Sequence, residues 1–238
     1  MAGRMIEFTS EGNGPVPGYL AVPPSGTGPG VIVVQEWWGL VPHIRAVADR
    51  LAAAGCTALA PDLYHGRQVG LDEPDEAGKA MMALDATRAA REMAGAVEEL
   101  LRLPEVSGEG VGAIGFCMGG GLAVQLATVH PAVVACVDYY GIPAACADLG
   151  QIRGPVLGHF ADHDDIATPA AVRALAERLT DAEVTHQFHT YPDAGHAFFN
   201  DERPGTYRAA AAELSWERTL AFLRAELGAP RPRREAGL

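Results

Sequence analysis

Hydrophobic positions along the chain follow two patterns, and the two patterns alternate. Continuous apolar runs such as residues 31–34 are typical of strands that are covered on both faces of a sheet. Stretches with apolar residues at helical spacing follow these runs, for example over residues 43–51, with Gly55 as a stop signal. The first pattern, together with two short runs near the start, predicts strands over residues 5–9, 16–22, 31–34, 56–60, 110–115, 133–139, 156–160 and 184–190.

The second pattern predicts the helices and, with them, the fold class. Helices are expected over residues 43–51, 72–103 with a break around Gly78, 119–129, 169–179 and 207–227. Strands that alternate with helices imply right-handed crossovers and a mostly parallel, doubly wound α/β sheet of about seven to eight strands flanked by helices. We expect one domain over residues 1–227, an antiparallel opening, and a mobile C-terminal tail over residues 228–238.

Composition narrows the class of protein further. The chain has 30 acidic and 18 basic residues, a formal charge of −12, and 48% hydrophobic residues. Such an acidic surface repels phosphate backbones and anionic lipid, so nucleic acid and membranes are not expected as partners. Four cysteines are too few for a disulfide scaffold in a chain of this length. With no apolar run near the roughly 18 residues of a spanning helix, the prediction is a soluble cytoplasmic protein.

The strongest chemical motif lies between a predicted strand and a predicted helix. It reads Gly115-Phe116-Cys117-Met118-Gly119, which is G-x-C-x-G in the setting that the nucleophile motif G-x-S-x-G requires. The flanking glycines leave room for a sharp turn, and the helix N-terminus carries partial positive charge that stabilises a thiolate. Cys117 is therefore the candidate nucleophile. The alternatives are a small buried structural cysteine and a glycine-rich phosphate loop.

Two later loops offer an acid and a base for such a nucleophile. Three aspartates, Asp162, Asp164 and Asp165, follow the predicted strand over residues 156–160, and His196 follows the strand over residues 184–190. The order nucleophile, acid, base at the carboxyl ends of successive strands is typical of this arrangement. Imidazole can take and return a proton near neutral pH when a carboxylate fixes its tautomer.

No metal or other cofactor is expected. The pair Asp162 and Asp164 resembles the start of a calcium loop, but Ile166 stands where a third oxygen ligand would be needed. His186 and His189 lie three apart in a predicted strand and therefore face opposite ways.

The loop Gln35-Glu36-Trp37-Trp38-Gly39 follows the first central strand. A loop in this position donates one backbone N–H to an oxyanion hole, and the residue after the nucleophile donates the other. Trp37 and Met118 are the candidates for these two groups. Glu36 beside the hole is a candidate for proton exchange, and a hydrogen-bonded structural glutamate is the alternative.

With these residues in place, the chain resembles the dienelactone hydrolase (carboxymethylenebutenolidase) family of α/β-hydrolases from about residue 5 to residue 227. The resemblance rests on the Glu36 loop, on Pro61-Asp62-Leu63-Tyr64, on the Cys117 motif extended by Gly120, on the Asp164 segment and on Ala194-Gly195-His196-Ala197-Phe198. It implies an α/β-hydrolase fold, a triad of Cys117, His196 and Asp164, and cofactor-independent opening of an enol-lactone through a thioester. It also implies that Glu36 pairs with the thiol at rest and takes its proton when substrate arrives.

The sequence departs from this family pattern where a substrate carboxylate is bound. The resemblance implies an arginine four residues after the catalytic histidine, but this chain has Asn200. An amide does not reproduce a bidentate guanidinium clamp, so specificity for dienelactone itself does not follow. Three residues could supply a cation instead, with exposed charge as the alternative for each: Arg67, Lys79 and Arg203. Four aromatic residues could line a pocket, with core packing as the alternative: Trp37, Tyr64, Phe198 and Phe199.

The predicted function is therefore a hydrolase of small esters or lactones that acts as a monomer or weak homodimer without a cofactor. An α/β-hydrolase without catalytic activity that binds a small molecule or another protein is the alternative, because fold alone does not determine function. A third hypothesis is an amidotransferase-like or peptidase-like thiol enzyme. The combination of Glu36 with the late Asp164 and His196 favours the first hypothesis over the third.

Overall fold

The computed structural model describes residues 3–12 and 14–228 of the chain. Within these residues, eight strands form a single sheet: β1 (Arg4–Thr9), β2 (Pro15–Ala21), β3 (Gly28–Val34), β4 (Thr57–Pro61), β5 (Val106–Phe116), β6 (Val133–Tyr139), β7 (Val156–His163) and β8 (His186–Gly195). Their spatial order is β1-β2-β4-β3-β5-β6-β7-β8. The pairs β1–β2 and β2–β4 are antiparallel, and all other neighbouring strands are parallel. The predicted antiparallel opening and mostly parallel sheet are confirmed.

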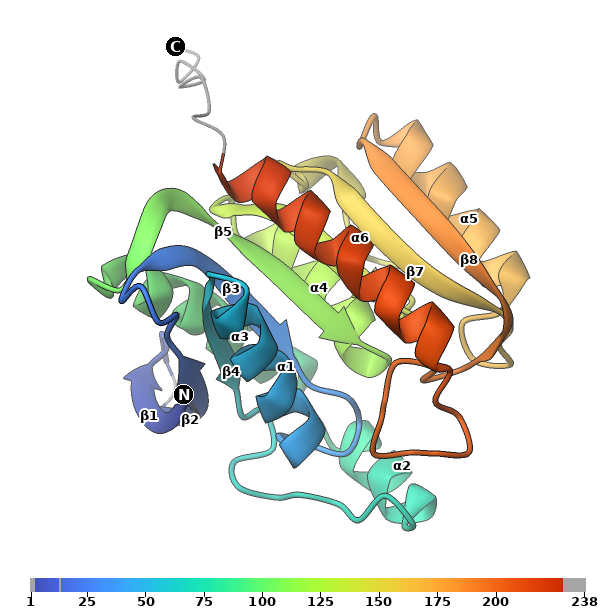
Figure 1. Cartoon of the computed structure of the whole chain (residues 1–238), viewed down its shortest axis with the longest axis horizontal. Helices are drawn as coiled ribbons and strands as arrows, with labels where there is room; N and C mark the ends of the chain where they lie inside the picture. The colour runs from blue at the N-terminus through green and yellow to red at the C-terminus, as the bar shows by residue number, and fades with distance from the viewer. Residues whose placement is uncertain (1–2, 13, 229–238) are drawn as a thin grey trace.

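Helices lie on both faces of this sheet (Figure 1). Their bounds are α1 (Pro42–Ala53), α2 (Pro74–Met82), α3 (Ala86–Arg102), α4 (Met118–Val129), α5 (Pro169–Asp181) and α6 (Ala209–Gly228). In Figure 1, α1 and α6 cover the face toward the viewer, α3, α4 and α5 cover the other face, and α2 stands apart from the sheet. None of the described helices is long and apolar enough to cross a membrane.

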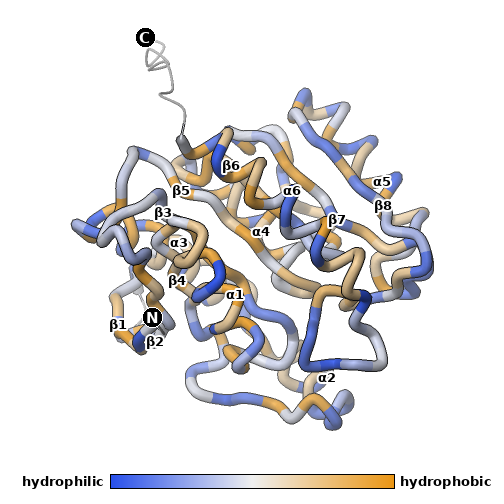
Figure 2. Tube along the Cα trace, viewed as in Figure 1, coloured by the Kyte–Doolittle hydropathy of each residue, from blue (hydrophilic) through white to orange (hydrophobic). Residues whose placement is uncertain are grey.

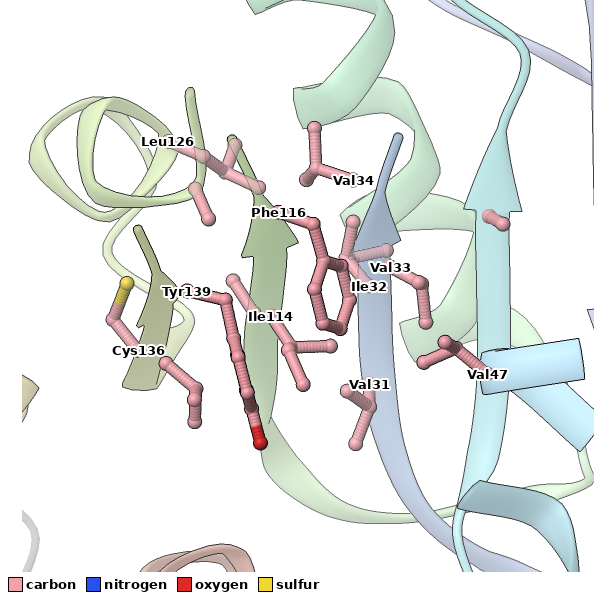
Figure 3. Close-up of a cluster of buried hydrophobic side chains, with 14 of the residues drawn as sticks. Val31, Ile32, Val33, Val34, Val47, Ile114, Phe116, Leu126, Cys136 and Tyr139 are labelled. Carbon is pink, nitrogen blue, oxygen red and sulfur yellow. The ribbon is translucent and has the colours of Figure 1, made fainter. Parts of the chain in front are cut away.

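The core lies around the central strands β3, β5 and β6. Val31 to Val34 have no exposed surface, as the continuous apolar run predicts for a strand covered on both faces. Figure 3 shows Ile114 and Phe116 of β5 beside the side chains of β3, with Tyr139 of β6 on the other side of Ile114. The rings of Phe116 and Tyr139 have centroids 4.8 Å apart. Hydrophobic residues gather along the central strands, whereas hydrophilic residues are frequent along α5 (Figure 2). This core fixes the carboxyl ends of β3 and β5, where the candidate chemistry lies.

Some predicted boundaries are wrong. The long helical region breaks between α2 and α3 rather than at Gly78, which lies inside α2. The Asp85 carboxylate caps α3 by accepting from the N–H groups of Thr87 at 2.9 Å and Arg88 at 3.0 Å, so helix α3 begins there. Strand β8 continues to Gly195, five residues beyond its predicted end, because it pairs with β7 as far as His163. Gly228 belongs to α6, and residues 229–238 of the predicted tail lie outside the described residues.

Candidate active site

Cys117 lies at the turn from β5 into α4. Its backbone has φ 56° and ψ −121°, a strained combination for a residue with a side chain. The turn is tight, because a Cβ atom on Gly115 would overlap the carbonyl oxygen of Gly119, and a Cβ on Gly119 would overlap the carbonyl oxygens of Gln35 and Val34. Both glycines of the motif are therefore sterically required, and the predicted elbow around Cys117 is present.

Cys117, His196 and Asp164 form a continuous hydrogen-bonded line. His196 Nε2 lies 3.1 Å from Cys117 Sγ, and His196 Nδ1 lies 2.9 Å from Asp164 Oδ2. The other Asp164 oxygen accepts from the backbone N–H groups of Ile166 at 2.8 Å and Ala167 at 2.9 Å. Of the three candidate aspartates, Asp164 is thus the one that is hydrogen-bonded to the histidine.

The charges of the three groups reinforce one another. Burial favours the neutral imidazole of His196, but the hydrogen bonds and charges of Asp164 and Cys117 outweigh burial and raise the His196 pKa to about 10. Burial likewise opposes ionisation of Asp164, yet the hydrogen bond from His196 and the two N–H donors hold the Asp164 pKa below its ordinary value. His196 thus lies between the Asp164 carboxylate and the Cys117 sulfur and is hydrogen-bonded to both.

The two predicted oxyanion-hole donors are the backbone N–H groups of Trp37 and Met118. The Gly39 N–H donates to the Glu36 carbonyl at 3.2 Å, which closes a turn with Trp37 at its first central position. Gly39 has φ 95°, so glycine suits this turn. Met118 is the first residue of α4, and its N–H has no acceptor within the helix. The predicted donors therefore lie on the loop after β3 and at the start of α4, directly after Cys117.

Glu36 lies in the same site, but its partners differ from those that the family resemblance implies. The side chain is buried, Oε1 accepts from the Tyr140 hydroxyl at 3.3 Å, and Oε2 accepts from Asn200 Nδ2 at 2.7 Å. The thiol of Cys117 instead pairs with His196. In this structure Glu36 is a hydrogen-bonded buried acid rather than the partner of the thiol.

A cavity of about 160 Å³ joins these groups. Its walls are Glu36, Trp37, Trp38, Cys117, Ile166, His196, Ala197, Arg203 and Thr206. The guanidinium carbon of Arg203 lies 5.4 Å from the centroid of the Trp38 ring, within the range of a cation–π interaction. The cavity is small for a ligand site, so it suits a small acyl group beside a cation.

The other predicted pocket residues have different places. Phe198 and Phe199 are buried in the core, where Phe199 stacks on Phe116 with ring centroids 5.3 Å apart, and neither phenylalanine lines the cavity. The chain turns inward after Ala197, whose φ is 61°, and the Phe198 ring packs against the Tyr140 ring with centroids 5.4 Å apart. The prediction that the two phenylalanines bind substrate is wrong. Asn200 is also fully buried and binds Glu36.

Tyr64 lies at the edge of the site rather than in its cavity. Its hydroxyl donates to Met118 Sδ at 3.8 Å, and its ring lines a neighbouring cavity of about 220 Å³. Burial, with the nearby charge of Cys117, raises the Tyr64 pKa to about 12. The remaining candidate cations, Arg67 and Lys79, are exposed and pair with Glu76 at 3.3 Å and 2.6 Å. Exposed charge is therefore the correct interpretation of these two.

Sequence reasoning missed five residues of the site: Trp38, Tyr140, Ile166, Ala197 and Thr206. Tyr140 directly follows β6. A polar residue at the carboxyl end of a parallel strand is often part of the binding site, so its position in the sequence could have identified it. Thr206 lies ten residues after His196 in a loop, where no sequence pattern marks it.

Comparisons with known proteins agree with this geometry. The model of the dienelactone hydrolase family matches residues 16–227. "Protein usf" of Aquifex pyrophilus is 35% identical over 230 residues, covering 93% of this chain and 98% of that protein. A protein of Aquifex aeolicus named "Putative carboxymethylenebutenolidase" is 33% identical over 233 residues, covering 94% of this chain and 99% of the relative.

A solved structure shows the same fold. The crystal structure named as that of a "Putative Dienelactone Hydrolase" from Klebsiella pneumoniae has a TM-score of 0.83 and 28% sequence identity, and the match covers 93% of this chain and 97% of that chain. The family match therefore spans strands β3 to β8 and every catalytic candidate. The chain belongs to the dienelactone hydrolase family of α/β-hydrolases.

Proposed function

We propose that this protein hydrolyses small esters or lactones through Cys117, His196 and Asp164, with a thioester intermediate and no cofactor. The observation that carries the proposal is the hydrogen-bonded line from Asp164 through His196 to Cys117, which ends in a cavity beside two backbone donors. Membership of a hydrolase family supports the reaction class. Location in the cytoplasm and a monomer or weak homodimer remain predictions.

The first half of the reaction forms the thioester. Cys117 passes its proton to His196 Nε2, and Sγ attacks the ester carbonyl carbon. The carbonyl oxygen becomes an oxyanion that the N–H groups of Trp37 and Met118 stabilise. As the tetrahedral intermediate collapses, the carbon–oxygen bond of the ester breaks and His196 gives its Nε2 proton to the leaving oxygen. Asp164 stabilises the imidazolium while His196 carries this proton. In a lactone, the leaving alcohol stays attached to the acyl group.

The second half releases the acid and restores the thiolate. His196, now neutral, takes a proton from a water molecule that attacks the thioester carbon. The same two N–H groups stabilise the second oxyanion. The carbon–sulfur bond then breaks, and Cys117 leaves as a thiolate beside the imidazolium.

Arg203 is our candidate for binding an anionic group of the substrate. Its side chain lines the cavity with Cys117 and His196 and is partly exposed. Stacking against Trp38 leaves the guanidinium N–H groups available to a ligand oxygen. A substrate with a carboxylate a few atoms from its ester bond would fit this arrangement.

A hydrolysis screen tests the proposal. Wild type, Cys117→Ala and Cys117→Ser are assayed with p-nitrophenyl esters, neutral lactones and carboxylate-bearing lactones. We expect both substitutions to lower kcat at least about 1,000-fold, since they remove the nucleophile. Cys146→Ser is the matched control, because Cys146 is an exposed free cysteine outside the cavity. Retained turnover in both Cys117 variants would overturn the proposal, and tight binding without turnover by wild type would favour the non-catalytic alternative.

A further inference from the structure

Glu36 is a buried acid in the wall of the active-site cavity, and the triad does not use it. Only 1% of its surface is exposed. Each of its carboxylate oxygens accepts a hydrogen bond from a neutral donor, one from Tyr140 and one from Asn200. Two donors on the two oxygens match an ionised carboxylate, and the hydrogen bond of the Cys117 thiol is made to His196 Nε2 instead.

The amide of Asn200 is held in one orientation. Its Oδ1 accepts from the backbone N–H of Glu202 at 3.1 Å, so the Nδ2 group must face Glu36. Its backbone N–H donates to the carbonyl oxygen of Ala197 at 3.0 Å. The loop after His196 therefore presents a fixed donor, which cannot rotate away from Glu36 without losing the bond to Glu202.

Tyr140 is held as firmly from the other side. It has φ 43°, and its backbone N–H donates to the His159 carbonyl at 2.9 Å. Its ring lies edge-on to the ring of His196, with centroids 5.1 Å apart. Burial, with the charges of Glu36 and Cys117, raises the Tyr140 pKa well above its ordinary value, so the hydroxyl keeps its proton and donates a hydrogen bond to Glu36.

We infer that Asn200 and Tyr140 hold Glu36 as a carboxylate that does not take the thiol proton, so that Cys117 is activated at rest by His196 without substrate. This inference rests on the proposed function of the same site. The proton moves from Cys117 Sγ to His196 Nε2 across a distance of 3.1 Å, which leaves a thiolate and an imidazolium. Asn200 and Tyr140 are positioning residues in this scheme, because they act through Glu36.

The charges around the thiolate are consistent with this resting state. His196 and Arg203 supply positive charge on the cavity wall, and Cys117 itself precedes the N-terminus of α4. Glu36 supplies negative charge on the same wall, and Asp164 lies behind His196. The remaining titratable neighbours, Tyr64 and Tyr140, stay protonated, because each has a raised pKa.

The test measures the thiol without substrate. Alkylation of Cys117 by iodoacetamide is followed by mass spectrometry of its peptide, and thiolate absorbance is measured as the difference between wild type and Cys117→Ala. An ordinary thiol, with a pKa of about 8.5, reacts about a hundredfold faster at pH 8.5 than at pH 6. We expect the rate for Cys117 to change by less than about threefold over this range. A rise like that of an ordinary thiol would overturn the inference.

Variants of the network separate its parts. Glu36→Gln should keep the flat alkylation profile, whereas His196→Asn should abolish it. Asn200→Ala combined with Tyr140→Phe frees Glu36 to pair with the thiol, so alkylation at pH 6 should fall about tenfold. Adding Glu36→Gln to this pair should restore the profile. Loss of the flat profile in Glu36→Gln alone would show that Glu36 is the base of the thiol, and would overturn the inference.

Tyr207→Phe is the matched control for the tyrosine change, because Tyr207 lies in the loop after Asn200 but does not line the cavity. Circular dichroism and thermal unfolding show which variants fold. If the double variant Asn200→Ala, Tyr140→Phe does not fold, Glu36→Gln alone still tests whether Glu36 is the base of the thiol. A flat profile without ester cleavage would support the resting thiolate and contradict the proposed function. Ester cleavage together with the alkylation profile of an ordinary thiol would support the proposed function and overturn the inference of a resting thiolate.

Discussion

The position of the Cys117 thiol depends on neighbouring residues that have no side chain. Gly119 packs against the carbonyl oxygens of Gln35 and Val34 at the end of β3, so the first turn of α4 lies directly on the strand that leads to the Trp37 loop. The nucleophile and one oxyanion-hole donor are therefore fixed relative to each other by a backbone contact. Any side chain at residue 119 must separate them.

The first prediction concerns this contact. Gly119→Ala should lower kcat for ester cleavage more than tenfold and the free energy of unfolding by about 1–3 kcal/mol, because backbone atoms must move to admit the Cβ. Gly78→Ala is the control: a Cβ there has its nearest neighbour at 4.0 Å, on Trp37, and alanine favours the helix by up to about 1 kcal/mol. Urea unfolding and steady-state assays measure both. Equal stability of wild type and Gly119→Ala would contradict the prediction.

The second prediction concerns the imidazole of His196. Its pKa is raised to about 10 by Asp164 and Cys117 against the effect of burial. Cys117→Ala and Asp164→Asn each remove one of these partners, so in each variant the pKa should fall toward the ordinary value near 6.5. Titration of the ring protons by NMR measures this value. An unchanged pKa in Cys117→Ala would mean that the thiol does not share its proton with His196.

The same pKa determines how stability depends on pH. His196 binds its proton more tightly in the folded chain than in the unfolded chain, whose imidazole has a pKa near 6.5. Its contribution to stability is therefore fully present below about pH 6.5 and is lost as pH rises through about 10. Cys117→Ala should weaken this dependence, which unfolding curves at several pH values can measure.

At the level of elements, the pattern of apolar residues predicts the strands and helices well, because burial on one or both faces determines it. Strand β6 and the start of α5 lie where the sequence predicts them. The break before α3 was misplaced because Gly78 is a weak signal inside a helix, whereas Asp85 is a capping residue whose effect depends on its own backbone geometry. Local sequence thus predicted the elements better than the boundaries between them.

The candidate site could be predicted where chemistry depends on local sequence. Cys117, Asp164 and His196 each follow a strand, in the chain order nucleophile, acid, base that the fold requires. Their meeting at one edge of the sheet could therefore be predicted. The partners of Glu36 were not, because Tyr140 and Asn200 reach it from 104 and 164 residues away. The inward turn at Ala197 that buries Phe198 and Phe199 is likewise a tertiary effect.

A buried polar cluster between the sheet and α6 carries the third prediction. His159 on β7 is fully buried, and its two ring nitrogens contact the Tyr191 hydroxyl at 2.8 Å and the Thr219 hydroxyl at 3.1 Å. Burial holds the His159 pKa well below its ordinary value, and the charges of His189 and Arg218 lower it further. This imidazole stays neutral in the folded chain, whereas in the unfolded chain it takes a proton below about pH 6.5.

Stability should therefore fall as pH decreases below about 6.5, by up to about 1.4 kcal/mol per pH unit from this group. His159→Gln removes the titrating group and should flatten this part of the pH profile, although it lowers stability at neutral pH by disturbing the cluster. Urea unfolding at about pH 5 and pH 7 gives both slopes. Equal slopes in wild type and variant would show that His159 takes its proton in the folded chain as well.

At the scale of the whole molecule, the net charge and the charge of the site have opposite effects on an anionic substrate. The chain carries a formal charge of −12, which repels anions at long range, whereas Arg203 lies on the wall of the active-site cavity. Long-range repulsion is screened by salt over a Debye length of about 10 Å at 0.1 M, but a contact inside a partly buried site is screened much less. Salt should therefore change the association rate of an anionic substrate more than the strength of its contact with Arg203.

The fourth prediction follows from this difference. For a carboxylate-bearing ester, kcat/KM should rise severalfold between about 0.01 M and 0.1 M ionic strength, whereas for a neutral ester of the same size it should stay constant. Arg203→Gln should lower kcat/KM for the carboxylate ester about tenfold or more and leave the neutral ester nearly unchanged. Parallel assays of both esters across the salt series measure these effects. If salt lowers kcat/KM for the carboxylate ester, local attraction by Arg203 outweighs the field of the acidic surface during approach as well as in the bound state.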